Sequence, residues 1–373
     1  MSTPSPQSTP PASVSAAVHA LGWPDAAREI AFDQWLKLLA NSHGLVPDSV
    51  GIASADASFR RYFRARMGRG SCILMDAPPD KENNPAFVQI AKLFGQAGLR
   101  VPQVLQWDEA HGFMLLDDLG TRTMMQVLET ADPAMRHSLF GQATDALLQL
   151  QQASRPDILP VYDEALLRRE LMLFPQWYVA QHKQVLLDDA QLSRLHAVFD
   201  TVIAHNLAAP QVFVHRDFMP RNLMVSSSSQ ASPVLGVLDF QDAVYGPITY
   251  DIASLMRDAF VSWDEDVCLD VTVRYWEKAC RQGLLDFEDW HQDFGAFYRA
   301  VEWMGLQRHL KVAGIFARLG IRDGKPKYLA DTPRFIAYLR STASRYRELF
   351  PLLRLIDQIE DTSSAVAFSF GRL

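Results

Sequence analysis

The segment VFVHRDFMPRNLMV, residues 212–225, places charged and amide side chains between two short apolar runs. His215, Arg216 and Asp217 are consecutive, and Asn222 stands one turn further on. An aspartate on such a turn can accept the proton of an attacking hydroxyl, and an asparagine oxygen can bind Mg²⁺. Phosphoryl transfer from a nucleotide needs both groups, and the spacing fits the His-Arg-Asp-x-x-x-x-Asn pattern of kinase catalytic loops.

A second acidic residue follows the same segment. The residues SSSSQASP at 226–233 predict a hairpin loop, and the next strand, VLGVL, ends at Asp239. The hairpin would bring Asp239 to the same end as Asp217, so Asn222 and Asp239 are the predicted metal ligands. Each feature alone is also typical of a hydrogen-bonded strand end. Their co-occurrence favours the kinase interpretation.

Composition narrows the class of protein. The chain has 373 residues and a net charge of −7, which disfavours a general nucleic-acid binder. Cys72, Cys268 and Cys280 are too widely spaced to suggest disulfides or a zinc site. No apolar run approaches the roughly 20 residues of a transmembrane helix, and the first residues lack the basic region of a signal peptide. We therefore expect a cytoplasmic protein without nucleic-acid or membrane partners; the sequence identifies no protein partner.

The order of predicted elements indicates an α+β chain of two lobes. Ser, Thr and Pro dominate residues 1–22, which we expect to be a disordered tail. Residues 23–118 predict a small nucleotide-binding lobe with an antiparallel sheet. Residues 119–373 predict a larger, mainly helical lobe that carries the catalytic and substrate groups, with a β insert at 212–242. A cleft between two lobes is a natural ligand site.

The stretch from VHRDFMPRNLMV through VLGVLDFQDAVYGPITYDIASLMRD resembles the aminoglycoside phosphotransferase and choline kinase superfamily, which has a bilobal protein-kinase-like fold. The resemblance implies ATP and Mg²⁺, with Asp217 as catalytic base and Asp251 as the aspartate that supports the loop. Arg221 lies inside the loop and is the best candidate for a cation near the reaction. The segment FMLLDDLG resembles the family's hinge, where backbone groups of Leu116 and Asp118 would meet adenine.

Longer segments give a narrower resemblance, to the bacterial kinases that phosphorylate N-acetylmuramate and N-acetylglucosamine at the anomeric hydroxyl during cell-wall recycling. It runs from about residue 50 to about residue 345. It implies that an amino sugar and a nucleotide are the small-molecule partners. The segments that carry it are ADASFRRYFR, LLRRELMLFPQWY, HRDFMPRNLM, DFQDAVYGP and MGLQRHLKVAGIFARL.

The phosphate-binding groups depart from the kinase pattern. The third strand, SCILMDAPP, contains no lysine, and the helix that follows, PAFVQIAKLFGQ, contains no glutamate. Another cation must therefore meet the phosphates, while small residues such as Ser58 could cover them with backbone amides. A solvated strand face is the alternative for each arginine. The candidate cations are Arg60, Arg61, Arg64 and Lys81, of which we favour Arg60 and Arg64.

The lactyl carboxylate of N-acetylmuramate calls for a cation in the acceptor pocket, and aromatic faces suit sugar rings. Two polar segments of the larger lobe offer such groups, although solvated helix charges are the alternative for most of them. The predicted sugar contacts are Arg168, Glu170, Trp177, Tyr178, Arg308 and His309.

Two other functions stay open. One is an aminoglycoside or other small-alcohol phosphotransferase of the same fold. The other is an inactive kinase-like binding module, which the absent strand lysine makes conceivable. The intact set of Asp217, Asn222 and Asp239 argues against the module.

Overall fold

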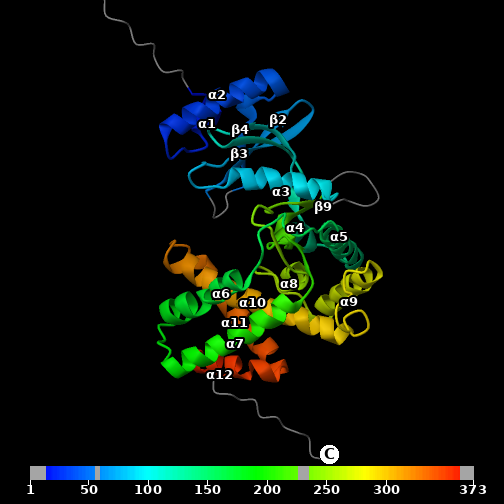
Figure 1. The fold of residues 1–373 in the computed structure, drawn as a ribbon. Helices are drawn as coiled ribbons and strands as arrows, with labels where there is room; N and C mark the ends of the chain where they lie inside the picture. Colours follow the sequence, from blue (N-terminus) through cyan, green and yellow to red (C-terminus); the bar gives the residue numbers. More distant parts are fainter. Residues whose placement is uncertain (1–13, 55–58, 226–234, 362–373) are drawn as a thin grey trace, which may run out of the picture. The chain divides into compact units, whose positions relative to one another are not determined.

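The computed structural model describes residues 14–54, 59–225 and 235–361, and the chain divides into two compact units. The smaller one, unit 1, comprises 1–96, 100–121 and 225–241, and the larger, unit 2, comprises 97–99, 122–224 and 242–373. Figure 1 shows a sheet with helices in unit 1 and mostly helices in unit 2. The predicted class, a small antiparallel sheet followed by a mainly helical part, is confirmed. The division differs from the predicted boundary at residue 118, because residues 119–121 and 225–241 group with unit 1 and residues 97–99 group with unit 2.

Unit 1 is built on a five-stranded antiparallel sheet in the order β1-β2-β3-β5-β4. One face of the sheet packs on helix α2 (Ala26–His43), where the ring of Phe32 lies 5.4 and 5.2 Å, centroid to centroid, from the rings of Phe63 and Phe113. Alternation along β2 puts Phe63 on this face and Arg64 on the opposite one. The strands are β1 (Gly51–Ser54), β2 (Arg61–Met67), β3 (Gly70–Asp76), β4 (Val104–Asp108) and β5 (Phe113–Asp117).

Order begins earlier than the sequence predicted. Helix α1 (Ala16–His19) precedes α2 (Ala26–His43), and Val18 is fully buried. The carbonyl of Val18 accepts a hydrogen bond of 2.8 Å from Trp23 Nε1. The predicted tail of 1–22 was therefore too long, because this segment packs on α2 and joins the apolar core that α2 shares with the sheet. The first 13 residues of the tail lie outside the described part.

A tight turn fixes the hairpin of β4 and β5. Gly112 has φ +72°, and a Cβ there would lie 2.0 Å from the carbonyl oxygen of Ala77. The turn thus needs glycine both for its backbone angle and for its close approach to the chain after β3. Asn84, the first residue of α3 (Asn84–Gln96), closes the same turn by donating to the Ala77 oxygen at 2.8 Å.

A distant segment joins unit 1 and explains the changed boundary. Strand β9 (Leu235–Val237) lies beside residue 100, since the Val237 amide donates to the Arg100 carbonyl at 2.7 Å. Phe240, fully buried, packs on α3 against Phe87 and Phe94 at centroid distances of 5.1 and 5.8 Å. These contacts hold Asp239 to unit 1.

Unit 2 is organised around α10 (Phe294–Ile321), a 28-residue helix that is buried over most of its circumference. Helices α6, α7, α8 and α11 and the π-helix η2 contact it. The remaining helices are α4 (Met124–Leu128), α5 (Pro133–Gln152), α6 (Glu164–Leu171), η2 (Phe174–His182), α7 (Asp189–Ala208), α8 (Thr249–Met256), α9 (Glu265–Arg281), α11 (Thr332–Arg345) and α12 (Phe350–Ile359), with 3₁₀ turns η1 (Pro47–Ser49, in unit 1), η3 (Pro220–Asn222), η4 (Pro326–Asp331) and η5 (Arg347–Leu349).

Short strands in this part of the chain frame the candidate site. Strand β7 (Gln211–Val214) pairs antiparallel with β10 (Val244–Pro247). The sequence did not predict β10, because its glycine and proline disfavour strands. Two other short strands are β6 (Arg122–Thr123) and β8 (Leu223–Val225). Among the described residues, no helix combines the length and apolarity needed to cross a membrane.

Candidate active site

The loop between β7 and β8 folds around the backbone of Asp217. The carbonyl of Asp217 accepts from the Met219 amide and from Asn222 Nδ2, both at 2.9 Å. The Asp217 amide donates to His215 Nδ1 at 3.2 Å, which makes this ring nitrogen an acceptor. Because the amide nitrogen of Asn222 donates to the loop, the side-chain oxygen is the atom that could bind a metal.

Asp251 on α8 holds the backbone of the two residues before the predicted base. It is fully buried, and its carboxylate accepts from the amides of His215 at 2.7 Å and Arg216 at 3.0 Å. Burial raises the pKa of Asp251 to about 7, although the two amides and Arg308 oppose the rise. Arg216 has φ +75°, a left-handed conformation that costs a non-glycine residue about 1–2 kcal/mol. The bond to Asp251 helps to maintain it.

Arg308, predicted as a sugar contact, lies against the loop instead. The residue is 3% exposed, and its guanidinium donates to the carbonyl of Arg216 at 2.8 Å and lies 4.8 Å from the ring centroid of Tyr250. Asp251 and Arg308 therefore fix both polar backbone groups of Arg216.

Glu170, also predicted as a sugar contact, is bound to the same loop. Its carboxylate accepts from Arg216 Nη2 at 2.5 Å, from Lys311 Nζ at 3.0 Å and from the Tyr162 hydroxyl. Burial would raise the pKa of Glu170, but Lys311 and Arg216 hold it below its usual value. The sequence missed Tyr162 and the role of Lys311, since neither stands in a recognisable spacing with the loop.

Two other predicted sugar contacts have partners on other helices. Arg168 forms ion pairs with Glu164 at 2.9 Å and Asp200 at 2.7 Å on the surface of α6 and α7. Tyr178 is buried in η2 and donates to Glu360 at 2.8 Å. The structure does not bring either side chain to the catalytic loop.

Trp177 and His309 complete the predicted sugar set. Trp177 is half-buried in η2. His309 is 2% exposed and stacks on the ring of Tyr338, with centroids 4.7 Å apart. Burial, followed by the nearby guanidinium of Arg257, holds the pKa of His309 well below its usual value, so the ring is neutral.

Arg221 lies in η3, in the same turn as Asn222, and is half-buried. Its guanidinium covers the ring of Phe260 at 4.3 Å, a cation–π contact that sets the direction of the side chain. The loop thus contains a fixed cation four residues after Asp217.

Asp239, the second predicted metal ligand, is an exposed residue of unit 1 with φ +65°. Its Oδ1 accepts from Gln241 Nε2 at 2.9 Å. A carboxylate and an amide oxygen suit Mg²⁺, which binds few protein groups and keeps several waters. No cluster of three or more His, Cys, Asp or Glu capable of holding a metal occurs in the described part of the chain. Asn222 belongs to unit 2 and Asp239 to unit 1, so their pairing as magnesium ligands stays a prediction.

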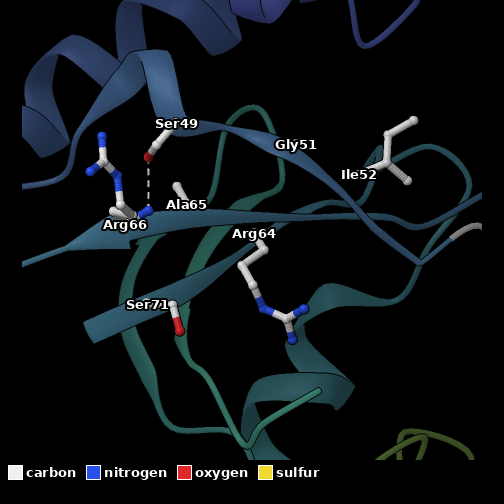
Figure 2. Close-up of a pocket in the computed structure, with 7 residues that line it drawn as sticks. All are labelled: Ser49, Gly51, Ile52, Arg64, Ala65, Arg66 and Ser71. Carbon is white, nitrogen blue, oxygen red and sulfur yellow. Dashed lines mark hydrogen bonds between the residues drawn. The ribbon is translucent and has the colours of Figure 1, made fainter. Parts of the chain in front are cut away.

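Arg64 and Asp118, two of the predicted nucleotide-binding residues, contact each other beyond the end of β5. Arg64 donates to the Asp118 carboxylate at 2.7 Å and to the Gly120 carbonyl at 2.7 Å, and the Ser71 hydroxyl reaches the same carboxylate at 2.6 Å. A cavity of about 280 Å³ lies here, and Figure 2 shows Arg64 and Ser71 on its wall with Ile52 of β1. Arg64 is thus bound to the carboxylate of Asp118.

Leu116 and Asp118 differ in what they offer a ligand. Leu116 lies inside the sheet, paired with Ile73 on one side and Val104 on the other. Backbone groups beyond the end of β5, from Asp118 onward, are therefore the better candidates for the hinge contacts.

Arg60 forms a buried ion pair with Glu82. The distance is 2.9 Å, and the side chains are 7% and 12% exposed. Glu82 stands just before α3, so the sequence search for a glutamate within the helix missed it. Ser58, the other predicted phosphate contact, lies outside the described residues.

Comparison with a family model decides the wider assignment. The model described as "Phosphotransferase enzyme family" matches residues 49–291, which include the catalytic loop, Asp239 and Asp251. The chain belongs to this phosphotransferase family.

Curated relatives match nearly the whole chain. A protein of Pseudomonas aeruginosa named N-acetylmuramate/N-acetylglucosamine kinase is 46% identical over 351 residues, which cover 91% of this chain and 99% of the relative. A protein of the same name from Neisseria meningitidis is 44% identical over 346 residues, 92% of this chain and 99% of the relative.

Solved structures share the fold at low identity. A choline/ethanolamine kinase family protein from Mesorhizobium loti aligns with a TM-score of 0.57 at 14% identity, covering 88% of this chain and 99% of that one. An ADP-bound aminoglycoside phosphotransferase aligns with a TM-score of 0.56 at 13% identity, covering 83% and 96%. These likenesses confirm the predicted phosphotransferase fold.

Proposed function

We propose that the chain is an ATP- and Mg²⁺-dependent kinase that phosphorylates N-acetylmuramate and N-acetylglucosamine at the anomeric hydroxyl. The observation that carries this proposal is the near full-length similarity to relatives named for both sugars, together with an intact catalytic loop. ATP is a cytoplasmic co-substrate, so the reaction belongs in the cytoplasm. Its product would feed the reuse of cell-wall amino sugars.

Asp217 acts as the general base for the acceptor hydroxyl. The anomeric hydroxyl of a free sugar is more acidic than its other hydroxyls, which makes a carboxylate an adequate base. The loop is well suited to the task, because the bonds to its backbone from Asp251 and Arg308 fix the residue before the base. Arg221 is the cation proposed to meet negative charge near the reaction.

Asn222 and Asp239 would hold Mg²⁺, which supplies charge neutralisation on the transferred phosphoryl group. In unit 1, the cavity beside Arg64 and the backbone beyond Asp118 are proposed to receive the nucleotide base. Arg60 with Glu82 supplies a buried cation–carboxylate pair of the kind that kinases place at the phosphates.

The sugar contacts need revision from the sequence-based set. Glu170 and Arg308 are bound to the loop, while Arg168 and Tyr178 have partners on other helices. Among the predicted aromatic residues, the half-buried Trp177 is the remaining candidate to stack on the sugar ring.

The test is a comparison of free N-acetylglucosamine with its methyl glycoside, followed by phosphorus NMR. The free sugar should acquire a phosphate at the anomeric carbon, and the methyl glycoside should bind weakly without turnover, because its nucleophile is blocked. Transfer to the methyl glycoside, or to an aminoglycoside at a comparable rate, would refute the anomeric assignment. No transfer to any acceptor would favour a binding module.

A further inference from the structure

Arg216, the residue before the proposed base, has its side chain bound to residues outside the catalytic loop. Arg216 directs Nη2 to Glu170 at 2.5 Å and Nη1 to the carbonyl of Asp242 at 3.3 Å. Its guanidinium also lies 5.9 Å from the ring centre of Tyr162. The side chain is 18% exposed, so the ion pair with Glu170 is partly shielded from water and from salt.

Glu170 is the centre of a small charge network between α6, α10 and the loop. One oxygen accepts from both Arg216 and Lys311, and the other accepts from the Tyr162 hydroxyl. Lys311 also lies 3.2 Å from the hydroxyl of Tyr250. A buried carboxylate is tolerated when it has several donors, and each partner lost leaves a buried charge uncompensated. Both oxygens are thus already bonded within the protein.

The backbone of Arg216 gives this anchor a consequence for the reaction. Its φ of +75° is unfavourable for arginine, and it directs the chain into Asp217. Asp251 and Arg308 hold the backbone on either side of the arginine, and Glu170 holds its side chain. If the side-chain anchor is lost, the residue can relax toward an ordinary backbone conformation and carry Asp217 with it.

We propose that Glu170 is a positioning residue, which acts through Arg216 to hold Asp217 in its reactive orientation and does not bind the sugar. This inference rests on the proposed function, in which Asp217 is the base. A displacement of about 1 Å at a reacting group can reduce turnover about 10²-fold while substrate affinity is kept. The signature of the role is therefore a loss in kcat without a matching rise in the KM for the sugar.

The first experiment compares Glu170→Gln with the wild type, using N-acetylglucosamine and ATP. Glutamine preserves the shape and removes the charge, so kcat should fall by a factor on the order of 10 to 10², with both KM values changed less than about threefold. Glu170→Asp, which retains the charge, should recover part of the loss. Glu164→Gln is the matched control, because Glu164 lies on the same helix with its side chain 64% exposed. It should leave kcat unchanged.

A double-mutant cycle with Arg216→Met tests whether Glu170 acts through the arginine. The double variant should have the kcat of Arg216→Met alone, since the two residues form one unit. The double variant removes both charges of the ion pair together. Comparing its kcat with that of Arg216→Met alone therefore tests the proposal even if Glu170→Gln fails to fold. If the kcat of the double variant instead fell by the product of the two factors measured for the single variants, the residues would act independently and the inference would be overturned. A raised KM for the sugar with unchanged kcat in Glu170→Gln would do the same.

Failure of the proposed function looks different. A wild-type protein that phosphorylates no sugar, or an Asp217→Asn variant with full turnover, would overturn the assignment of the base and this inference with it. Wild-type turnover that depends on Asp217 but not on Glu170 would overturn this inference alone.

Discussion

Replacing Asp251 by alanine should lower both the free energy of unfolding and the turnover rate. The carboxylate accepts from two buried amides, those of His215 at 2.7 Å and Arg216 at 3.0 Å. Each buried donor left without an acceptor costs about 1–3 kcal/mol, so the pair amounts to about 2–6 kcal/mol of unfolding free energy. Asp251→Asn keeps one acceptor oxygen and should lose about half as much. Turnover should fall in both, because the loop before Asp217 is released.

Urea unfolding with linear extrapolation measures the loss, provided that the slope with denaturant is unchanged. The control is Asp270→Ala, which removes an exposed pair with Arg274 at 2.6 Å on helix α9. Such helix pairs contribute about 0.3–0.5 kcal/mol. If Asp251→Ala were no less stable than this control, the two amides would have other acceptors. The account of a loop supported by α8 would then be refuted.

Three further predictions concern the base, the buried aspartate and the hinge. Asp217→Asn should keep the fold, as circular dichroism can check, and lose transfer by a factor on the order of 10² or more; near wild-type kcat would contradict its role. Burial raises the pKa of Asp251 to about 7, so its stabilising contribution is complete below about pH 4 and lost as the pH rises through about 7. The unfolding free energy of the wild type should therefore decline relative to Asp251→Asn across this window, and a constant difference would argue against the buried titration. Arg64→Met should raise the KM for ATP about fivefold by releasing Asp118, since about 1 kcal/mol of lost hydrogen bonding corresponds to that factor; an unchanged KM would separate the cavity from the nucleotide.

Local features of this molecule could be predicted because their signals lie within a few residues. The spacing of Asp217 and Asn222 produces one folded turn, in which the asparagine bonds to the carbonyl of the aspartate. Helix α2 ends at Gly44, whose φ of +64° is the reason for a glycine stop. The hairpin turn at Gly112 likewise needs a glycine, because its φ is +72°.

Long-range partners could not be predicted, because composition and spacing do not specify which charges meet. Glu170 and Arg308 have the residue types of a sugar site, yet tertiary packing turns them to Arg216. Arg64 was expected at the phosphates, but the register of β2 beside β3 brings it to Asp118. In each case the decisive fact is the position of a partner tens of residues away.

The ion pair of Arg216 with Glu170 also bears on regulation. In many protein kinases, an activation loop becomes ordered when phosphorylation supplies a new anion for an arginine. Here the anion is a glutamate of the chain itself, placed 2.5 Å from the guanidinium as soon as the protein folds. An anion encoded in this way requires no signalling enzyme to install it and no phosphatase to remove it. Control of the reaction would then fall to the concentrations of nucleotide and acceptor.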